Sequence, residues 1–129
     1  MRSPTLTEGH VVQKTVMIVE DDFLIAMDLQ LLLEARGWRV MGPAATVGAA
    51  LLLLDDELPS VALLDLDLRD ELVTPVAVAL KAQGVPFAIA SAYGQPEKLA
   101  GDVLSGVVNV GKPTSERVLL TALETLTAH

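Results

Sequence analysis

Residues 61–69 read VALLDLDLR, a short apolar run that ends in two aspartates. The first four residues have the length and aliphatic character of a buried strand. Asp65 follows directly at the carboxyl end of this run, and Asp67 comes two residues later. In an open parallel sheet, ligands bind outside the carboxyl ends of the strands. The sequence therefore places two acids where such a fold carries its chemistry.

The same alternation of a short apolar run with a longer helical pattern occurs five times along the chain. Strands are predicted at residues 15–19, 38–42, 61–64, 85–90 and 107–110, and helices at 22–36, 46–57, 74–83, 97–104 and 114–127. Thr74 and Pro75 are predicted as the N-cap and first residue of the third helix. Five consecutive βα units predict a flavodoxin-like, doubly wound α/β fold, (βα)5, with a five-stranded parallel sheet and helices on both faces.

Length and composition fit one packed domain. The chain has 129 residues, of which 51% are hydrophobic and 20% charged. Residues 1–14 lack the apolar segment of a signal peptide, so we expect a flexible lead-in there and the folded domain at 15–129. No apolar run approaches the roughly 18–20 residues of a membrane span, and we expect a cytoplasmic protein.

Charge and residue usage exclude several classes of function. The net charge of −8 argues against direct nucleic-acid binding, which needs a basic surface. The sequence has no cysteine, and its two histidines, His10 and His129, lie near the ends. Any chemistry in the core must therefore use carboxylates, hydroxyls and lysine.

Residues of these kinds stand at the expected carboxyl ends of four strands. They are Glu20 and Asp21 after the first strand, Asp65 and Asp67 after the third, Ser91 after the fourth and Lys112 after the fifth. Clustered oxygen ligands without histidine or cysteine favour Mg²⁺. A carboxylate beside the ion can attack a phosphoryl group, and a lysine and a hydroxyl can neutralise the phosphoryl oxygens.

Each of these residues also has a simpler interpretation. The acids at 20–22 can complement the dipole of the following helix. Asp65 can be a turn residue, Ser91 a hydrogen-bonded hydroxyl and Lys112 a solvated charge. The order in which they occur at successive strand ends is what favours a common site.

The chain resembles the receiver domains of two-component response regulators. The resemblance begins near Thr15 and rests on VMIVEDD (16–22), LLDLDL (63–68), AIASAY (88–93) and VGKP (110–113). It implies Asp65 as phosphoacceptor, Asp21 as the main Mg²⁺ ligand, Glu20 as a ligand acting mostly through water, and the Asp67 carbonyl as a further ligand. Ser91 and Lys112 are implied to contact the phosphoryl group, and the bond between Lys112 and Pro113 to be cis.

Two positions depart from most receivers. Asn109 stands where Tyr or Phe is usual, and Arg69 where Pro is common. With VTPVAVAL (73–80) and GVPF (84–87), they make the chain similar to the FAT-GUY single-domain receivers, although residues 89–92 (IASA) differ from the motif. That subclass is associated with general stress signalling in alphaproteobacteria and with HWE or HisKA2 kinases. Asn109 cannot act as an aromatic switch, so Tyr93 becomes the switch candidate.

The resemblance implies a stand-alone bacterial receiver that takes a phosphoryl group from a histidine kinase or phosphotransfer protein and signals by protein contact to a downstream regulator. It would catalyse its own phosphorylation and dephosphorylation without being an enzyme in the usual sense. One alternative is a haloacid-dehalogenase-type phosphohydrolase with Asp65 as nucleophile. That family needs an acidic pair after the lysine, whereas here the pair comes first. Another alternative is a phosphorylation-independent interaction module.

Overall fold

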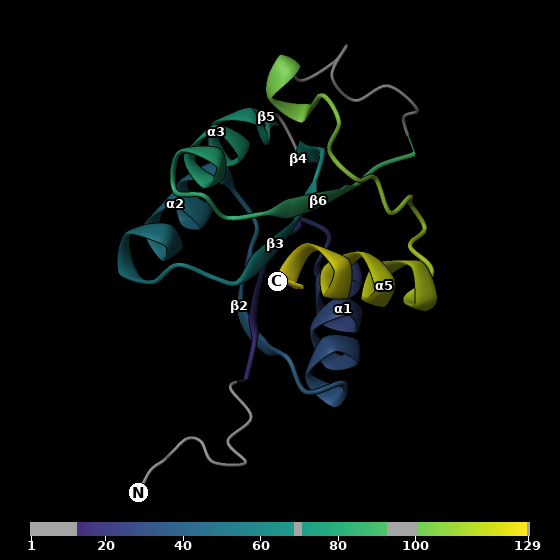
Figure 1. The fold of residues 1–129 in the computed structure, drawn as a ribbon. Helices are drawn as coiled ribbons and strands as arrows, with labels where there is room; N and C mark the ends of the chain where they lie inside the picture. Colours follow the sequence, from purple (N-terminus) through teal and green to yellow (C-terminus); the bar gives the residue numbers. More distant parts are fainter. Residues whose placement is uncertain (1–12, 69–70, 93–100, 129) are drawn as a thin grey trace, which may run out of the picture.

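The computed structural model describes residues 13–68, 71–92 and 101–128, which form an α/β fold (Figure 1). Its main sheet contains four parallel strands in the order β2-β1-β3-β6. These strands are β1 (Thr15–Val19), β2 (Arg39–Ala44), β3 (Val61–Asp65) and β6 (Phe87–Ala90). The predicted lead-in falls largely in residues 1–12, outside the described residues.

Helices cover both faces of this sheet. Helices α1 (Phe23–Ala35) and α5 (Glu116–Thr127) lie on one face, and α2 (Val47–Asp56) and α3 (Thr74–Ala82) lie on the other (Figure 1). A short 3-10 helix, η1 (Asp102–Leu104), follows the second gap in the described residues. None of the described helices is long and apolar enough to cross a membrane.

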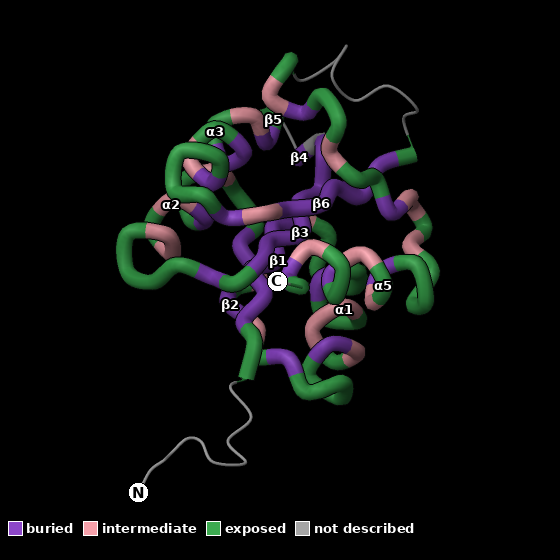
Figure 2. The backbone as a smooth tube through the Cα atoms, in the orientation of Figure 1, coloured by how far each residue is buried: buried purple, intermediate pink, exposed green. Residues whose placement is uncertain are grey.

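The central strands are buried on both faces, as Figure 2 shows. Successive side chains point to opposite faces of a strand. Val16 and Ile18 accordingly join the core beneath α1 and α5, while Met17 and Val19 join the core beneath α2 and α3. The continuous apolar run of β1 is explained by this two-sided packing.

Three of the helices have a side-chain N-cap, and α3 does not. Asp22, Thr46 and Ser115 cap α1, α2 and α5 by accepting backbone N–H groups of the first turn. The prediction for α3 is wrong by one residue, because Val73 is the N-cap and makes no side-chain capping bond. Thr74 is already helical, and Pro75 stands in the first turn of α3. Proline has no backbone N–H, but an N–H at this position would have no partner within the helix, so no helical hydrogen bond is lost.

The predicted fifth strand is not a strand of the sheet in the described structure. Within residues 107–110, Asn109 forms one isolated parallel bridge with Ile89. Ile89 donates to the Val108 carbonyl at 2.9 Å and accepts from the Val110 N–H at 2.8 Å. The segment thus runs beside β6 in the expected direction, but its pairing is too short to extend the sheet. The described sheet has four strands rather than the five expected.

A small antiparallel hairpin lies between β3 and α3, where no regular element was predicted. Its strands are β4 (Asp67–Leu68) and β5 (Glu71–Leu72). The Glu71 carboxylate accepts the Val47 N–H at 3.0 Å, so this hairpin contacts the N-terminus of α2. A carboxylate is favourable there because the first N–H groups of a helix have no partner within the helix.

Candidate functional site

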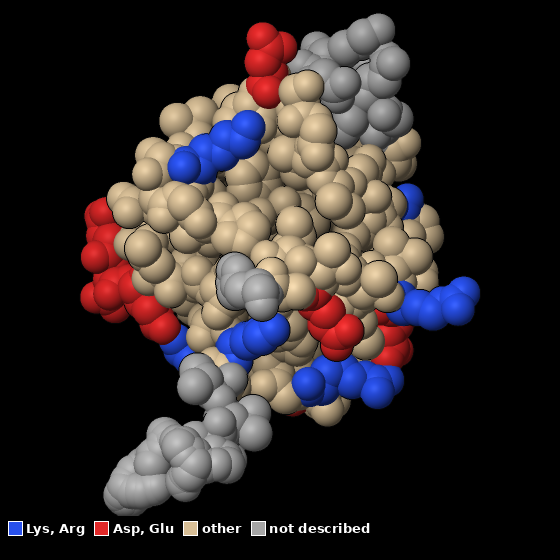
Figure 3. Space-filling model, viewed as in Figure 1, with Lys and Arg blue, Asp and Glu red and all other residues tan. Residues whose placement is uncertain are grey.

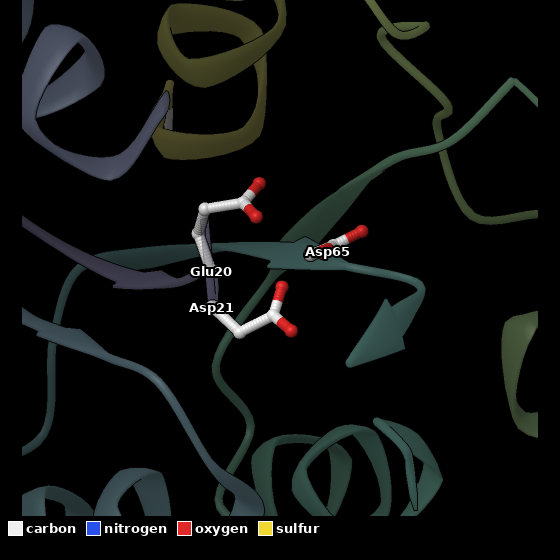
Figure 4. A group of neighbouring side chains, drawn as sticks. All are labelled: Glu20, Asp21 and Asp65. Carbon is white, nitrogen blue, oxygen red and sulfur yellow. The ribbon is translucent and has the colours of Figure 1, made fainter. Parts of the chain in front are cut away.

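Three carboxylates converge at the carboxyl edge of the main sheet. Strands β1 and β3 are adjacent, and Val19 is in register with Leu64, so Glu20 and Asp65 leave neighbouring strands at the same level. One oxygen from each of Glu20, Asp21 and Asp65 lies within 4.8 Å of the other two. Figure 4 shows their carboxyl groups facing a common space, Glu20 and Asp21 from the end of β1 and Asp65 from the end of β3.

The third acid of the 20–22 triplet has a different position. The Asp22 carboxylate accepts the Leu24 and Ile25 N–H groups at 3.0 and 3.1 Å and caps α1. The simpler interpretation of the triplet is therefore correct for Asp22. The Asp22 N–H in turn donates to the Glu20 carboxylate at 3.0 Å, which orients that side chain.

Lys112 provides a positive charge between two of these acids. Its ammonium lies 3.0 Å from an Asp65 oxygen and 3.3 Å from a Glu20 oxygen. Glu20 and Asp65 are buried, with 3% and 6% of their surface exposed, and the Lys112 side chain is 29% exposed. The Lys112 side chain is thus partly exposed, and its ammonium contacts two buried carboxylates. The Lys112–Pro113 bond is cis, as the resemblance implies.

Burial and repulsion shape the electrostatics of this group. Burial raises the pKa of Glu20 above its usual value, and the nearby Asp65 carboxylate raises it further. The Asp22 N–H and Lys112 oppose this effect without cancelling it. Burial alone would lower the pKa of Lys112, but its hydrogen bond to Asp65 and the charges of Asp65 and Glu20 raise that pKa above its ordinary value. Lys112 therefore remains an ammonium ion throughout the neutral pH range.

The donor set fits a hard divalent cation. Three carboxylates within reach of one point supply the oxygen ligands that Mg²⁺ prefers, and excess negative charge remains for a cation to neutralise. Asp67 lies two residues beyond Asp65, at the start of β4, and its carbonyl remains the predicted further ligand.

Ser91 lies on the same edge, one residue beyond β6. Ala90 is in register with Asp65, so Ser91 follows one step past the acid on the neighbouring strand. Ser91 is buried, and its backbone N–H donates to the side-chain oxygen of Asn109 at 3.1 Å. The switch candidate Tyr93 lies outside the described residues.

Sequence reasoning did not anticipate what the Asn109 side chain does. The same amide oxygen that accepts from Ser91 also accepts the Gly111 N–H at 2.9 Å. A side-chain bond to the backbone two residues ahead is an Asx turn, and Asn109 followed by Gly111 was the signal that could have predicted it. The second bond, to Ser91, depends on the packing of distant segments.

Several solved structures resemble this chain in fold and in sequence. SdrG from Sphingomonas melonis Fr1 is 33% identical, with a TM-score of 0.75, covering 90% of this chain and 98% of that chain. The PhyR response regulator REC domain of Erythrobacter litoralis is 30% identical, with a TM-score of 0.76, covering 88% and 89%. The anti-anti-sigma factor PhyR of Bartonella quintana is 28% identical, with a TM-score of 0.71, covering 91% of this chain and 48% of that longer one. No protein-family model and no curated protein matches the sequence.

Proposed function

This chain belongs to the response regulator receiver family, and we propose that it accepts a phosphoryl group from a phosphohistidine onto Asp65. The observation that carries the proposal is the contact of Asp65 with Lys112 beside Glu20 and Asp21. An acceptor carboxylate, a cation for the phosphoryl oxygens and acids for a metal ion are the parts that phosphoryl transfer to aspartate requires.

Each residue of the group has a separate role in this proposal. An Asp65 oxygen attacks phosphorus, the bond between phosphorus and the donor imidazole nitrogen breaks, and the imidazole keeps the electron pair and takes a proton from solvent. Lys112 moves from neutralising the carboxylates to neutralising a phosphoryl oxygen, and the Ser91 hydroxyl donates to another. Glu20, Asp21 and Asp65, with the Asp67 carbonyl, would hold Mg²⁺, which neutralises phosphoryl charge when bound.

We also propose that the output is protein contact. The charge of the protein argues against the other common output, which is binding to nucleic acid through a basic surface. The net charge is −8, and on the face drawn in Figure 3 the basic side chains are scattered among acidic ones rather than gathered in a patch. A histidine kinase or phosphotransfer protein would supply the phosphoryl group. PhyR is an anti-anti-sigma factor in Bartonella quintana, and a further solved neighbour is described as the PhyR stress response regulator. By this similarity we propose a regulator protein of the stress response as the downstream partner. Cytoplasmic location stays a prediction from the sequence.

Two alternative functions make different predictions for phosphorylation of the protein. A haloacid-dehalogenase-type phosphohydrolase would turn over substrate continuously, and an interaction module would not be phosphorylated. The receiver family of the solved neighbours and the acidic pair at the end of β1, ahead of Asp65 in the sequence, both favour the receiver.

The test is labelling with acetyl phosphate and MgCl₂, followed by intact-mass measurement. Wild-type protein should gain one acid-stable, base-labile phosphoryl group, and Asp65→Asn should gain none. Asp56→Asn, which changes an exposed acid at the end of α2, is the matched control and should label normally. Equal labelling of wild type and Asp65→Asn would reject Asp65 as the acceptor.

A further inference from the structure

Asn109 lies on the segment that leads to Lys112 and runs beside the segment that leads to Ser91. Each of these two segments thus carries a residue of the proposed site. The backbone on either side of Asn109 is held against Ile89, because Val108 accepts from and Val110 donates to that residue. This pairing fixes Asn109 next to the carboxyl end of β6. Its side chain then needs to reach only a short distance to meet the residue that follows that strand.

One oxygen of the Asn109 amide joins these two segments. It accepts the Ser91 N–H at 3.1 Å and the Gly111 N–H at 2.9 Å. A carbonyl oxygen has two lone pairs and can serve both donors at once. Ser91 carries the hydroxyl of the site, and Gly111 directly precedes Lys112. A single side-chain atom therefore fixes the backbone at both residues relative to each other.

The conformation at Gly111 makes this bond important for Lys112. Gly111 has φ of +84°, which L side chains rarely adopt and which gives the chain a sharp change of direction just before the lysine. The Asn109–Gly111 bond closes that turn, and the hydrogen bond from the Thr114 hydroxyl to the Gly111 carbonyl closes it from the other side at 2.7 Å. The Lys112 ammonium then reaches Asp65 at 3.0 Å.

From this geometry we infer that Asn109 is a positioning residue, which holds the Ser91 backbone and the Lys112 turn in one arrangement so that hydroxyl and ammonium meet the same phosphoryl group. The inference rests on the proposed function of Asp65. If Asn109 only formed the local turn, its hydrogen bond with Gly111 would be sufficient, and loss of its bond with Ser91 would not affect phosphorylation. The Ser91 bond is what distinguishes the two roles.

The experiment compares Asn109→Ala with Asn109→Asp and with Thr114→Val. The Ala variant removes the acceptor, the Asp variant keeps an acceptor oxygen at the same distance, and Thr114→Val removes a bond to the same turn without affecting Ser91. Two quantities are measured: amide exchange at Ser91 and Gly111 in the unphosphorylated protein, and the rate of acetyl phosphate labelling in MgCl₂.

We expect Asn109→Ala to speed exchange at both amides and to slow labelling by about 10- to 100-fold, since small misplacements of reacting groups have effects of this size. Asn109→Asp should keep both amides protected and label faster than the Ala variant. Thr114→Val loses a hydrogen bond to the same turn but should keep the Ser91 amide protected, so we expect it to slow labelling less than Asn109→Ala does.

The outcomes separate this inference from the proposed function. Normal labelling of Asn109→Ala, or equal slowing in Thr114→Val, overturns the positioning role and leaves the acceptor assignment intact. Wild-type protein that takes no label overturns the proposed function and the positioning role with it. Unchanged exchange at Ser91 in Asn109→Ala rejects the bond itself, whatever the labelling rates.

Discussion

The Lys112 ammonium lies 3.0 Å from an oxygen of Asp65, although the two residues belong to segments on either side of β6 in the chain. The contact places the positive charge on the carboxylate that we propose as the phosphoacceptor. Because Lys112 also contacts Glu20, it offsets part of the repulsion among the acids. The properties of the site should therefore depend on the balance between this one cation and three carboxylates.

Mg²⁺ should raise the melting temperature of the protein, because the proposed site of Glu20, Asp21 and Asp65 exists in the folded protein and not in the unfolded chain. At an ion concentration of roughly 100 times Kd, the gain is about 2.7 kcal/mol. Thermal unfolding in EDTA and in millimolar MgCl₂, at matched ionic strength, measures it. Asp21→Asn should lose most of the gain, whereas Asp56→Asn should keep it. A melting curve that does not respond to Mg²⁺ would contradict the proposed metal site.

Lys112→Ala should fold but label slowly. Loss of one charged donor to the phosphoryl oxygens should reduce the labelling rate by about 10²- to 10³-fold, as for other donors to developing negative charge. In EDTA the variant should also melt at a lower temperature, since the acids lose their partner, and MgCl₂ should restore much of the difference. Circular dichroism checks that the helical content is unchanged. A variant that labels at the wild-type rate would exclude the clamp role.

Glu20→Gln should stabilise the metal-free protein at neutral pH. The pKa of Glu20 is raised in the folded state by burial and by Asp65, so the folded protein is relatively most stable when this group is protonated. That stability is present below the unfolded pKa and is lost as pH rises through the raised folded pKa. In EDTA, the variant should therefore melt above wild type at pH 7.5, with a smaller difference at pH 4. A lower melting temperature at pH 7.5 would contradict the direction of the shift.

Tyr93, although outside the described residues, remains the switch candidate, because it follows Ser91 by two positions and Asn109 has no ring to turn inward. Phosphorylation should change the ring resonances of Tyr93, which is the sole tyrosine of the sequence and needs no assignment. The indole of Trp38, buried before β2, should change little. Tyr93→Ala should spare labelling of Asp65 and uncouple partner binding from it. Partner affinity that still responds to phosphorylation in this variant would reject the switch role.

The residues 61–65 and 15–22 were sufficient to predict much of the fold and of the acidic group. Their short aliphatic runs are typical of strands covered on both faces, and acids that directly follow such strands are expected to meet at one edge of a parallel sheet. Gly37 and Gly84 directly follow the helices predicted at 22–36 and 74–83, and both have positive φ, as is common for a glycine that ends a helix. The apolar run of a strand and the glycine at a helix end are local patterns, because each depends on the conformation of a few neighbouring residues.

The tertiary structure decided which acid does what and how the last segment pairs. Asp22 turns to cap α1 while Glu20 and Asp21 face Asp65, a choice that the three consecutive acids do not reveal. Residues 107–110 were predicted as a strand, but among them only Asn109 forms a bridge, to Ile89, and the segment does not join the sheet. The Ser91–Asn109 hydrogen bond is likewise a product of the tertiary structure. Its donor and acceptor meet because two distant segments pack side by side, and no periodicity in either segment records that contact.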